Sequence, residues 1–311
     1  MLHDSICIIN FNSMILIILM NCCFAAALPL LKYALEHIDP FLLVAWRMIA
    51  AGGILCLLQL LTQPRAFLRQ LNWPLLAFNG LLSMCLLCVF EAWSLQGITA
   101  TKANLMWATL PLLTALVMRI WMKESLAYPQ IGAIGLGIVG VMLLISSDTS
   151  TSWATLSLSS SWHYDIVMLL AVIMAACGYI CTQQLVDEQH PIVITNGISM
   201  LVGGIVTLAG TYLLQSTHNC PPTNWLPALG YISSIVIIVN FIGLSLQIWL
   251  TKRHSVILLA LSSFITPLCG ALFGLLQGDT WTHSLCGAAL CIGSGLYIFY
   301  QHDMKRTHYA T

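Results

Sequence analysis

Long runs of apolar residues, separated by short polar breaks, recur along almost the whole chain. A helix of about 17 to 25 apolar residues can cross a hydrocarbon core of roughly 30 Å, and each run has about this length. The pattern predicts an all-α integral membrane protein with ten transmembrane helices. They are expected at residues 14–35, 40–61, 74–97, 101–121, 127–146, 164–186, 191–215, 225–248, 254–276 and 281–301.

Composition agrees with this pattern. Of the 311 residues, 59% are hydrophobic and only 7% are charged, against roughly 25% charged in a soluble domain. Eleven basic and eleven acidic residues cancel, and no basic tract gathers to attract phosphates. We therefore expect no nucleic-acid partner. The expected surroundings are a lipid bilayer, and the expected partner is a small-molecule substrate.

Most of the twelve cysteines lie inside the apolar runs, where they are expected to act as small apolar fillers. Cys85 and Cys88, and likewise Cys177 and Cys181, have the spacing of metal ligands on one helix face. A zinc site needs four ligands, and the histidines lie outside the spans or at their ends. We therefore predict neither a metal nor another cofactor.

Basic residues predict the orientation, because short cytoplasmic loops carry the excess of Lys and Arg. With the N-terminus inside, eight basic residues fall on the inner side, and only Lys32 and Lys102 fall on the outer side. Both termini are therefore expected on the cytoplasmic side of a bacterial-type inner membrane. The eight inner residues are Arg65, Arg69, Arg119, Lys123, Lys252, Arg253, Lys305 and Arg306.

The chain also shows an internal repeat. A linker rich in Ser and Thr, residues 147–163, separates a first five-helix half, 14–146, from a second, 164–301. At an offset of 151, the residues that match are Pro40 with Pro191, Gly52 with Gly203 and Gly53 with Gly204. At an offset of 156, they are Glu91 with Gln247, Trp93 with Trp249 and Pro111 with Pro267.

Five helices per half is an odd number, so the second half must enter the membrane inverted. The charges change sides as inversion requires: the segment with Arg65 and Arg69 corresponds to "QSTHNCPPT", which has no basic residue. Inverted repeats are typical of secondary transporters, in which the substrate site lies between the halves. A membrane scaffold without transport activity is the structural alternative, and it does not require inversion.

Two stretches, "DPFLLVAWRMIAAGGIL" and "AWSLQGITATKANLMWATLPLLTALVMRIWMKESLAYPQIGAIGLGIVGVMLLI", resemble EamA-type permeases of the drug/metabolite transporter superfamily. The matching features are Arg47, Pro111 and Glu124, echoed by Asp279, and the glycine-rich fifth span. The resemblance implies a carrier of five plus five helices, with a central cavity lined by spans 1, 3, 4, 6, 8 and 9. Members of the family carry amino acids, nucleotide sugars, S-adenosylmethionine, purines and other metabolites. The second half departs from the pattern, with Ile198 at the place of Arg47.

Arg47 and Glu91 are the charged residues expected inside the membrane. At 1.5 Å per residue, each lies ~10 Å below the outer boundary. A buried Arg costs roughly 2.5 to 3.5 kcal/mol at a helix centre, and pairing with Glu91 would offset both desolvation costs. In the alternative, Arg47 extends toward the outer interface and binds carbonyl groups there. If protons drive transport, Glu91 is the expected carrier, because the nine histidines lie in loops, tails or span ends.

Polar and aromatic residues near the middle of the membrane complete the expected binding site. Asn104, Trp107 and Pro111 share one face of span four, and Ser263 and Pro267 repeat the last two in span nine. Asn240 and Gln247 share a face of span eight. The predicted substrate-binding residues are Arg47, Glu91, Asn104, Trp107, Asn240, Gln247 and Ser263. Hydrogen bonding between helices is the alternative role of the Asn and Gln side chains.

The predicted function is that of a permease. The sequence shows no nucleophile with a base at membrane depth and no Walker motif, so an enzyme and an ATP-driven pump are not expected. We predict alternating-access transport of a small amphipathic metabolite such as an amino acid. The alternatives are a nucleoside-type metabolite such as S-adenosylmethionine, or the scaffold. The glycines of "IGAIGLGIVG" predict close helix packing or a homodimer contact.

Overall fold

The computed structural model of the chain describes most of the predicted spans. It covers residues 2–62, 71–98, 100–121, 128–147, 162–188, 191–213, 225–254 and 256–269, together with 287, 290, 291, 293–295, 297 and 298. Most of the linker and of the tenth span therefore lie outside the described residues. The same holds for Arg65, Arg69, Lys123, Glu124, Asp279, Lys305 and Arg306.

The described residues form helices and no strands. The first half contains α1 (Leu2–Ala34), α2 (Pro40–Thr62), α3 (Trp73–Asn79), the π-helix η2 (Gly80–Leu86), α4 (Leu87–Ser94), α5 (Ala100–Trp107), α6 (Leu110–Trp121) and α7 (Tyr128–Ser147). The second half contains α8 (Trp162–Asp187), α9 (Ile192–Leu213), α10 (Trp225–Ile235), the π-helix η3 (Val236–Gly243), α11 (Leu244–Thr251) and α12 (Val256–Ser262).

Six helices among the described residues are long and apolar enough to cross a membrane. They are Ser13–Ala34, Pro40–Thr62, Trp73–Ser94, His163–Asp187, Ile192–Leu213 and Leu226–Thr251. Large apolar side chains on their outer faces are exposed, as Ile54, Leu57 and Leu61 are on α2. Such apolar faces suit the hydrocarbon core of a bilayer, which contains no water. The chain is therefore a multi-pass membrane protein, as the sequence predicts.

Local sequence sets where α2 begins, and hence how deep Arg47 lies. Pro40 occupies the first turn, where its missing N–H costs nothing. The Asp39 carboxylate before it accepts hydrogen bonds from the backbone N–H groups of Phe41 (2.9 Å) and Leu42 (3.3 Å). These bonds satisfy donors that a helix leaves free at its start. Arg47 then follows two helical turns into the span.

The end of α4 is also held in place. The Lys32 ammonium, at the end of α1, donates hydrogen bonds to the carbonyl oxygens of Leu95 and Ile98. A cation at the carboxyl end of a helix is favourable, because the last carbonyl groups there have no partners in the helix. This contact joins α1 to α4 one turn beyond Glu91.

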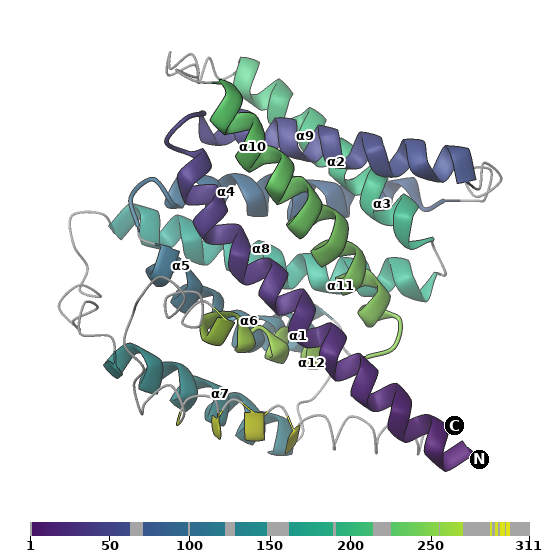
Figure 1. Ribbon diagram of the computed structural model, residues 1–311, viewed down its shortest axis with the longest axis vertical. Helices are drawn as coiled ribbons and strands as arrows, with labels where there is room; N and C mark the ends of the chain where they lie inside the picture. Colours follow the sequence, from purple (N-terminus) through teal and green to yellow (C-terminus); the bar gives the residue numbers. More distant parts are fainter. Residues whose placement is uncertain are drawn as a thin grey trace.

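The two halves meet along α2 and α9, which lie side by side (Figure 1). A Cβ atom added at Gly52 would lie 2.7 Å from the Gly197 carbonyl oxygen, and one added at Gly204 would lie 2.9 Å from the Ile49 backbone nitrogen. The earlier residue of α2 therefore faces the later residue of α9, so the two helices run antiparallel. Glycine is required for this approach of backbone to backbone.

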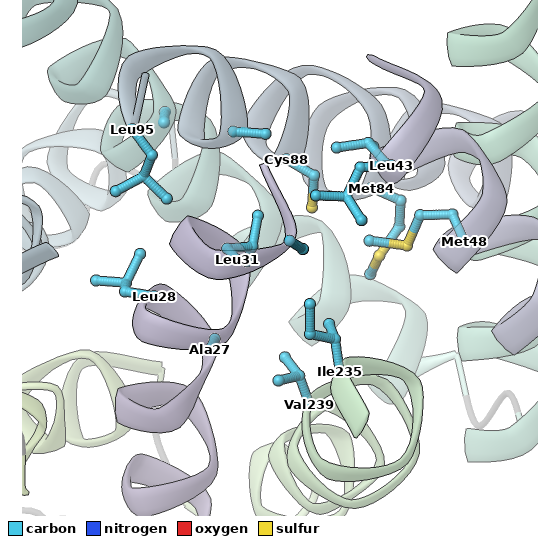
Figure 2. Close-up of a cluster of buried hydrophobic side chains, with 14 of the residues drawn as sticks. Ala27, Leu28, Leu31, Leu43, Met48, Met84, Cys88, Leu95, Ile235 and Val239 are labelled. Carbon is cyan, nitrogen blue, oxygen red and sulfur yellow. The ribbon is translucent and has the colours of Figure 1, made fainter. Parts of the chain in front are cut away.

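Helices α1 and α10–η3–α11 also pack side by side across the molecule, and α7 lies at its edge (Figure 1). A small apolar cluster of Leu76, Leu185, Ile194 and Ile198 joins α3, α8 and α9, and two larger ones fill the rest of the interior. One, with Tyr179, Leu110 and Phe264, joins α6, α8 and α12. The other joins α1, α2, α4 and η3. Figure 2 shows part of this last cluster, in which Leu28, Met48 and Val239 come from three different helices.

Candidate functional site

A central cavity lies between the two larger apolar clusters. It offers about 130 Å³ to the centres of water molecules, whereas about 10 to 15 Å³ is enough for one water. It can therefore hold a small solute or several waters. Its polar and aromatic lining comprises Asn21, Phe24, Arg47, Ser83, Glu91, Trp107, Tyr179, Thr182, Asn196, Asn240, Gln247, Ser263 and Thr266.

Six of the seven predicted binding residues line this cavity: Arg47, Glu91, Trp107, Asn240, Gln247 and Ser263. They come from helices of both halves. Asn104 is buried, but it is not among the described residues that line the cavity. It lies on α5 one turn before Trp107.

Arg47 lies at one end of the cavity. The side chain is 2% exposed, and its guanidinium donates a hydrogen bond to the Cys88 sulfur. Its Nε atom has no hydrogen-bond partner. A buried donor without a partner costs about 1 to 3 kcal/mol, so this arrangement favours a ligand that accepts a hydrogen bond there.

Glu91 lies on α4 at the same end of the cavity, close enough to Arg47 for the two charges to interact. One of its carboxylate oxygens accepts a hydrogen bond from the Trp107 indole N–H at 3.1 Å. The hydrogen bond positions the carboxylate and ties α4 to α5. The charged end of the cavity thus presents a cation and an anion together, beside an aromatic ring.

Met48, Met84, Cys88 and Val239 form the apolar part of the wall near this end (Figure 2). Low polarity around the two charges strengthens their interaction with each other and with a ligand. Methionine side chains are flexible and polarisable, which suits a wall that must adapt to more than one ligand.

The cavity lining also includes side-chain oxygen atoms that have no hydrogen-bond partner. Asn240 is fully buried and donates to the Met48 sulfur at 3.3 Å, and Asn196 donates to the Ser245 hydroxyl at 3.3 Å. The Oδ1 atoms of both, and the Oγ atom of Ser263, have no hydrogen-bond partner. These atoms supply hydrogen-bonding positions that a polar ligand can occupy.

The sequence did not single out Asn196, Tyr179, Ser83, Thr182 or Thr266 as lining residues. They are ordinary residues of apolar helices, and no spacing or charge distinguishes them. Which face of α8 or α9 looks inward is decided by packing against other helices. The only available signal for these lining residues was that they are polar residues in apolar spans, and this signal does not show which of them face inward.

The family and the relatives of the chain agree with a transport site. The sequence model of the EamA-like transporter family matches residues 11–146 and 162–301. An S-adenosylmethionine/S-adenosylhomocysteine transporter of Chlamydia muridarum is 24% identical over 91% of this chain and 89% of the relative. A transporter of the same name from Chlamydia trachomatis is 22% identical over 92% of this chain and 88% of the relative.

A solved crystal structure shares the fold. It aligns with a TM-score of 0.71 at 16% sequence identity, over 94% of this chain and 98% of the other. At this identity the likeness concerns the arrangement of helices alone.

Proposed function

Because the chain belongs to the EamA-like transporter family, we propose that it is a secondary active transporter of the cytoplasmic membrane. It moves a small amphipathic metabolite by alternating access, in which the two halves expose a shared site to each side in turn. The relatives are named as transporters, which supports a carrier rather than an enzyme.

The proposed architecture has ten spans in two inverted halves, with both termini in the cytoplasm. Two observations support the repeat. The π-helices η2 (80–86) and η3 (236–243) occupy equivalent places at the offset of 156, and the breaks at 108–109 and 263–264 do so at 155. The equivalent helices α2 and α9 run antiparallel, which is the relation that inversion requires.

The observation that carries the substrate proposal is the charged end of the cavity. A carboxylate can accept the free donor of Arg47, and an ammonium group can bind to Glu91. An α-amino-acid group carries both charges a few ångströms apart. The proposed substrate is therefore a metabolite with an α-amino-acid end.

Two substrate classes have such an end: amino acids themselves, and amino-acid nucleosides such as S-adenosylmethionine. The rest of the cavity favours the second class. The rings of Trp107 and Tyr179 offer stacking surfaces, and the amides of Asn196 and Asn240 offer partners for a base or a ribose. The names of the chlamydial relatives favour the same class.

The proposed coupling uses Glu91 as the group that carries a proton through the cycle. It is the carboxylate that lines the cavity among the described residues, and it is 7% exposed. Binding of a proton removes its charge, which changes its attraction to Arg47 and to the substrate ammonium. Coupling in this form needs no histidine.

The test is transport by the purified chain in lipid vesicles. Radiolabelled S-adenosylmethionine, S-adenosylhomocysteine, single amino acids and adenosine are offered with and without a pH gradient, and with unlabelled solute inside for exchange. We expect transport and exchange of the two amino-acid nucleosides and weaker competition by amino acids. Transport of adenosine alone, or of no solute with an amino-acid end, would contradict the proposal.

The glycines of α7 remain the predicted homodimer contact. Gly132 and Gly135 are exposed, and Cβ atoms added at them would meet nothing within 4 Å among the described residues. Small residues on an open face allow a second helix to approach closely. We propose it as the self-association surface, and cross-linking in vesicles would test it.

A further inference from the structure

A second hollow lies near the central cavity, between the first turns of α3 and the end of α8. It is shallow and open, unlike the central cavity. Its lining residues are Asn72, Pro74, Leu75, Phe78, Gln184, Asp187 and Glu188. The same two spans also line the central cavity a few residues further along, at Ser83 of η2 and Thr182 of α8. The two hollows are therefore neighbours along one pair of helices.

Asn79 lies between these two sets of residues and is 1% exposed. Its Oδ1 atom accepts hydrogen bonds from the hydroxyl groups of Ser83 (3.1 Å) and Thr182 (3.5 Å). Its amide nitrogen donates to the Ser199 hydroxyl at 3.2 Å, and that hydroxyl donates to the Leu76 carbonyl oxygen at 3.3 Å. The amide thus joins helices α3, η2, α8 and α9 in one layer.

This layer is the polar part of the wall between the two hollows. Its side chains are an amide and three hydroxyl groups, and the apolar cluster of Leu76, Leu185, Ile194 and Ile198 lies on the same helices α3, α8 and α9. Apolar constrictions exclude water by dewetting, whereas amide and hydroxyl groups can exchange their partners for water or for a polar solute. A polar solute that moves between the two hollows therefore finds its hydrogen-bonding partners in the Asn79 layer.

The local backbone is suited to rearrangement at this point. The π-helix η2 begins at Gly80, directly after Asn79, and π-helical turns in α-helices occur frequently at functional sites. A Cβ atom added at Gly80 would lie 2.6 Å from the Ser199 carbonyl oxygen. The backbone of η2 is thus tightly packed on α9 at the point where its hydrogen-bonding pattern changes.

We propose that solute passes between the central cavity and the α3–α8 hollow, and that Asn79 is the side chain which it displaces. This inference rests on the proposed transport function. The displaced amide and the hydroxyl groups of Ser83 and Thr182 then bind the passing solute. They favour solutes that carry hydrogen-bonding groups along their whole length, as a nucleoside does, over those with an apolar end.

The first test separates binding from transport. Asn79→Leu keeps the size of the side chain but removes its hydrogen bonds, so the layer becomes an apolar barrier. We expect binding of labelled S-adenosylmethionine or S-adenosylhomocysteine to the detergent-solubilised protein to change by less than about threefold, while transport in vesicles falls by at least tenfold. Asn79→Ser, which restores a polar group, should recover most of the transport.

Thr211→Val is the matched control. Thr211 is 3% exposed, donates only within its own helix to the Thr207 carbonyl oxygen, and does not line either hollow. Its loss should leave transport and binding unchanged. If Asn79→Leu transports within twofold of the wild type, or if it loses binding together with transport, the passage is wrong and Asn79 has a structural or binding role.

A second test does not depend on how well Asn79→Leu folds. Asn79→Cys and Thr182→Cys, combined in a Cys22→Ala background, place two thiols across the layer. Oxidation with copper phenanthroline should stop transport, and a reductant should restore it in the same vesicles. Transport that persists after complete cross-linking, measured by mass spectrometry, would overturn the passage. Wild-type protein that transports none of the solutes would instead refute the proposed function.

Discussion

Arg47 shows how one side chain can be both costly and useful. It is buried, yet only part of its guanidinium is satisfied by the protein, since Nε has no hydrogen-bond partner. A membrane protein that only needed stability would gain from an apolar residue at this place. The retained charge, directed into a cavity, is what a binding site for a carboxylate requires.

Replacement of Arg47 by Lys tests this role. Lysine keeps the charge but has neither the planar fork of the guanidinium nor its Nε donor. We expect affinity for a carboxylate substrate to fall roughly tenfold, or about 1.4 kcal/mol, with little loss of expression. Binding measured by competition against the labelled substrate checks this.

Arg253→Lys is the matched control for Arg47→Lys. The Arg253 guanidinium stacks on the Trp249 ring at 3.7 Å and lies outside the cavity lining. Its replacement should leave affinity unchanged. Equal affinity of the Arg47→Lys protein and the wild type would show that the guanidinium does not bind the carboxylate.

Glu91→Gln tests proton coupling. The amide oxygen of glutamine can still accept the hydrogen bond from Trp107, so the local structure should persist, but the side chain can no longer carry a proton. We expect accumulation driven by a pH gradient to be lost, while exchange of solute for solute continues. Uptake and exchange as functions of pH in vesicles measure both.

The exposed Glu36, in the turn that follows α1, provides the comparison. Glu36→Gln removes one carboxylate at a place away from the cavity and should leave both modes of transport intact. A Glu91→Gln protein whose uptake still follows the pH gradient would remove Glu91 from this role.

At the scale of the elements, the apolar runs predicted six of the helices closely. The runs 40–61 and 164–186 correspond to α2 (Pro40–Thr62) and α8 (Trp162–Asp187). The agreement is close because turn residues and polar breaks mark the ends of membrane helices. The π-helices were not predicted. Residues 80–86, "GLLSMCL", are as apolar as an ordinary helix. The change in backbone hydrogen bonding is visible only in the structure, where these residues pack against α9.

The charged residues that line the cavity could be predicted from the sequence, whereas the residues that helix packing places there could not. Arg47 and Glu91 stand out because a charge in an apolar run is rare. Asn79 and Asn196 carry no such mark, since amides also serve as contacts between helices. Asn104, which was predicted from its helical spacing to Trp107, is buried but is not among the described residues that line the cavity.

Two adjacent glycines of α2 test the contact with α9. A Cβ atom at Gly52 would strike backbone atoms of Gly197 and Leu201 at 2.7 and 2.8 Å, while one at Gly53 would meet nothing within 4 Å. Gly52→Ala should therefore destabilise the protein by about 1 to 3 kcal/mol. Gly53→Ala should stabilise it by about 0.5 to 1 kcal/mol through helix propensity.

Thermal unfolding in detergent, followed by intrinsic fluorescence, compares these two variants with the wild type. The pair is matched in chemistry and in position along the chain, so the sign of the difference reports the packing alone. Equal melting temperatures for Gly52→Ala and Gly53→Ala would show that α2 and α9 are not in backbone contact.

At the scale of the whole molecule, two cysteines report how the halves meet. The Sγ atoms of Cys22, on α1, and Cys269, in the ninth span, are 3.1 Å apart. The preceding residue on α1, Asn21, donates to the Ser262 hydroxyl at 2.9 Å and accepts from the Thr266 hydroxyl at 3.2 Å. A pair of free thiols and two hydrogen bonds thus connect the first and second halves at one place.

We expect mild oxidation to join Cys22 to Cys269 and to slow transport reversibly, because α1 and the ninth span both line the cavity. Mass spectrometry of the digested protein identifies the linked peptides. Cys22→Ala should be insensitive to the same treatment. Failure to form this link, while the protein remains folded, would contradict the packing of α1 against the ninth span.

The close approach of α2 and α9 limits how the molecule can move. Where two backbones touch through Gly52, Gly197 and Gly204, a shift of even a few ångströms would either open a gap to lipid or force atoms into collision. We therefore expect α2 and α9 to stay in contact while the remaining helices tilt around them. A drug that wedged them apart would act on the protein without ever entering its solute path.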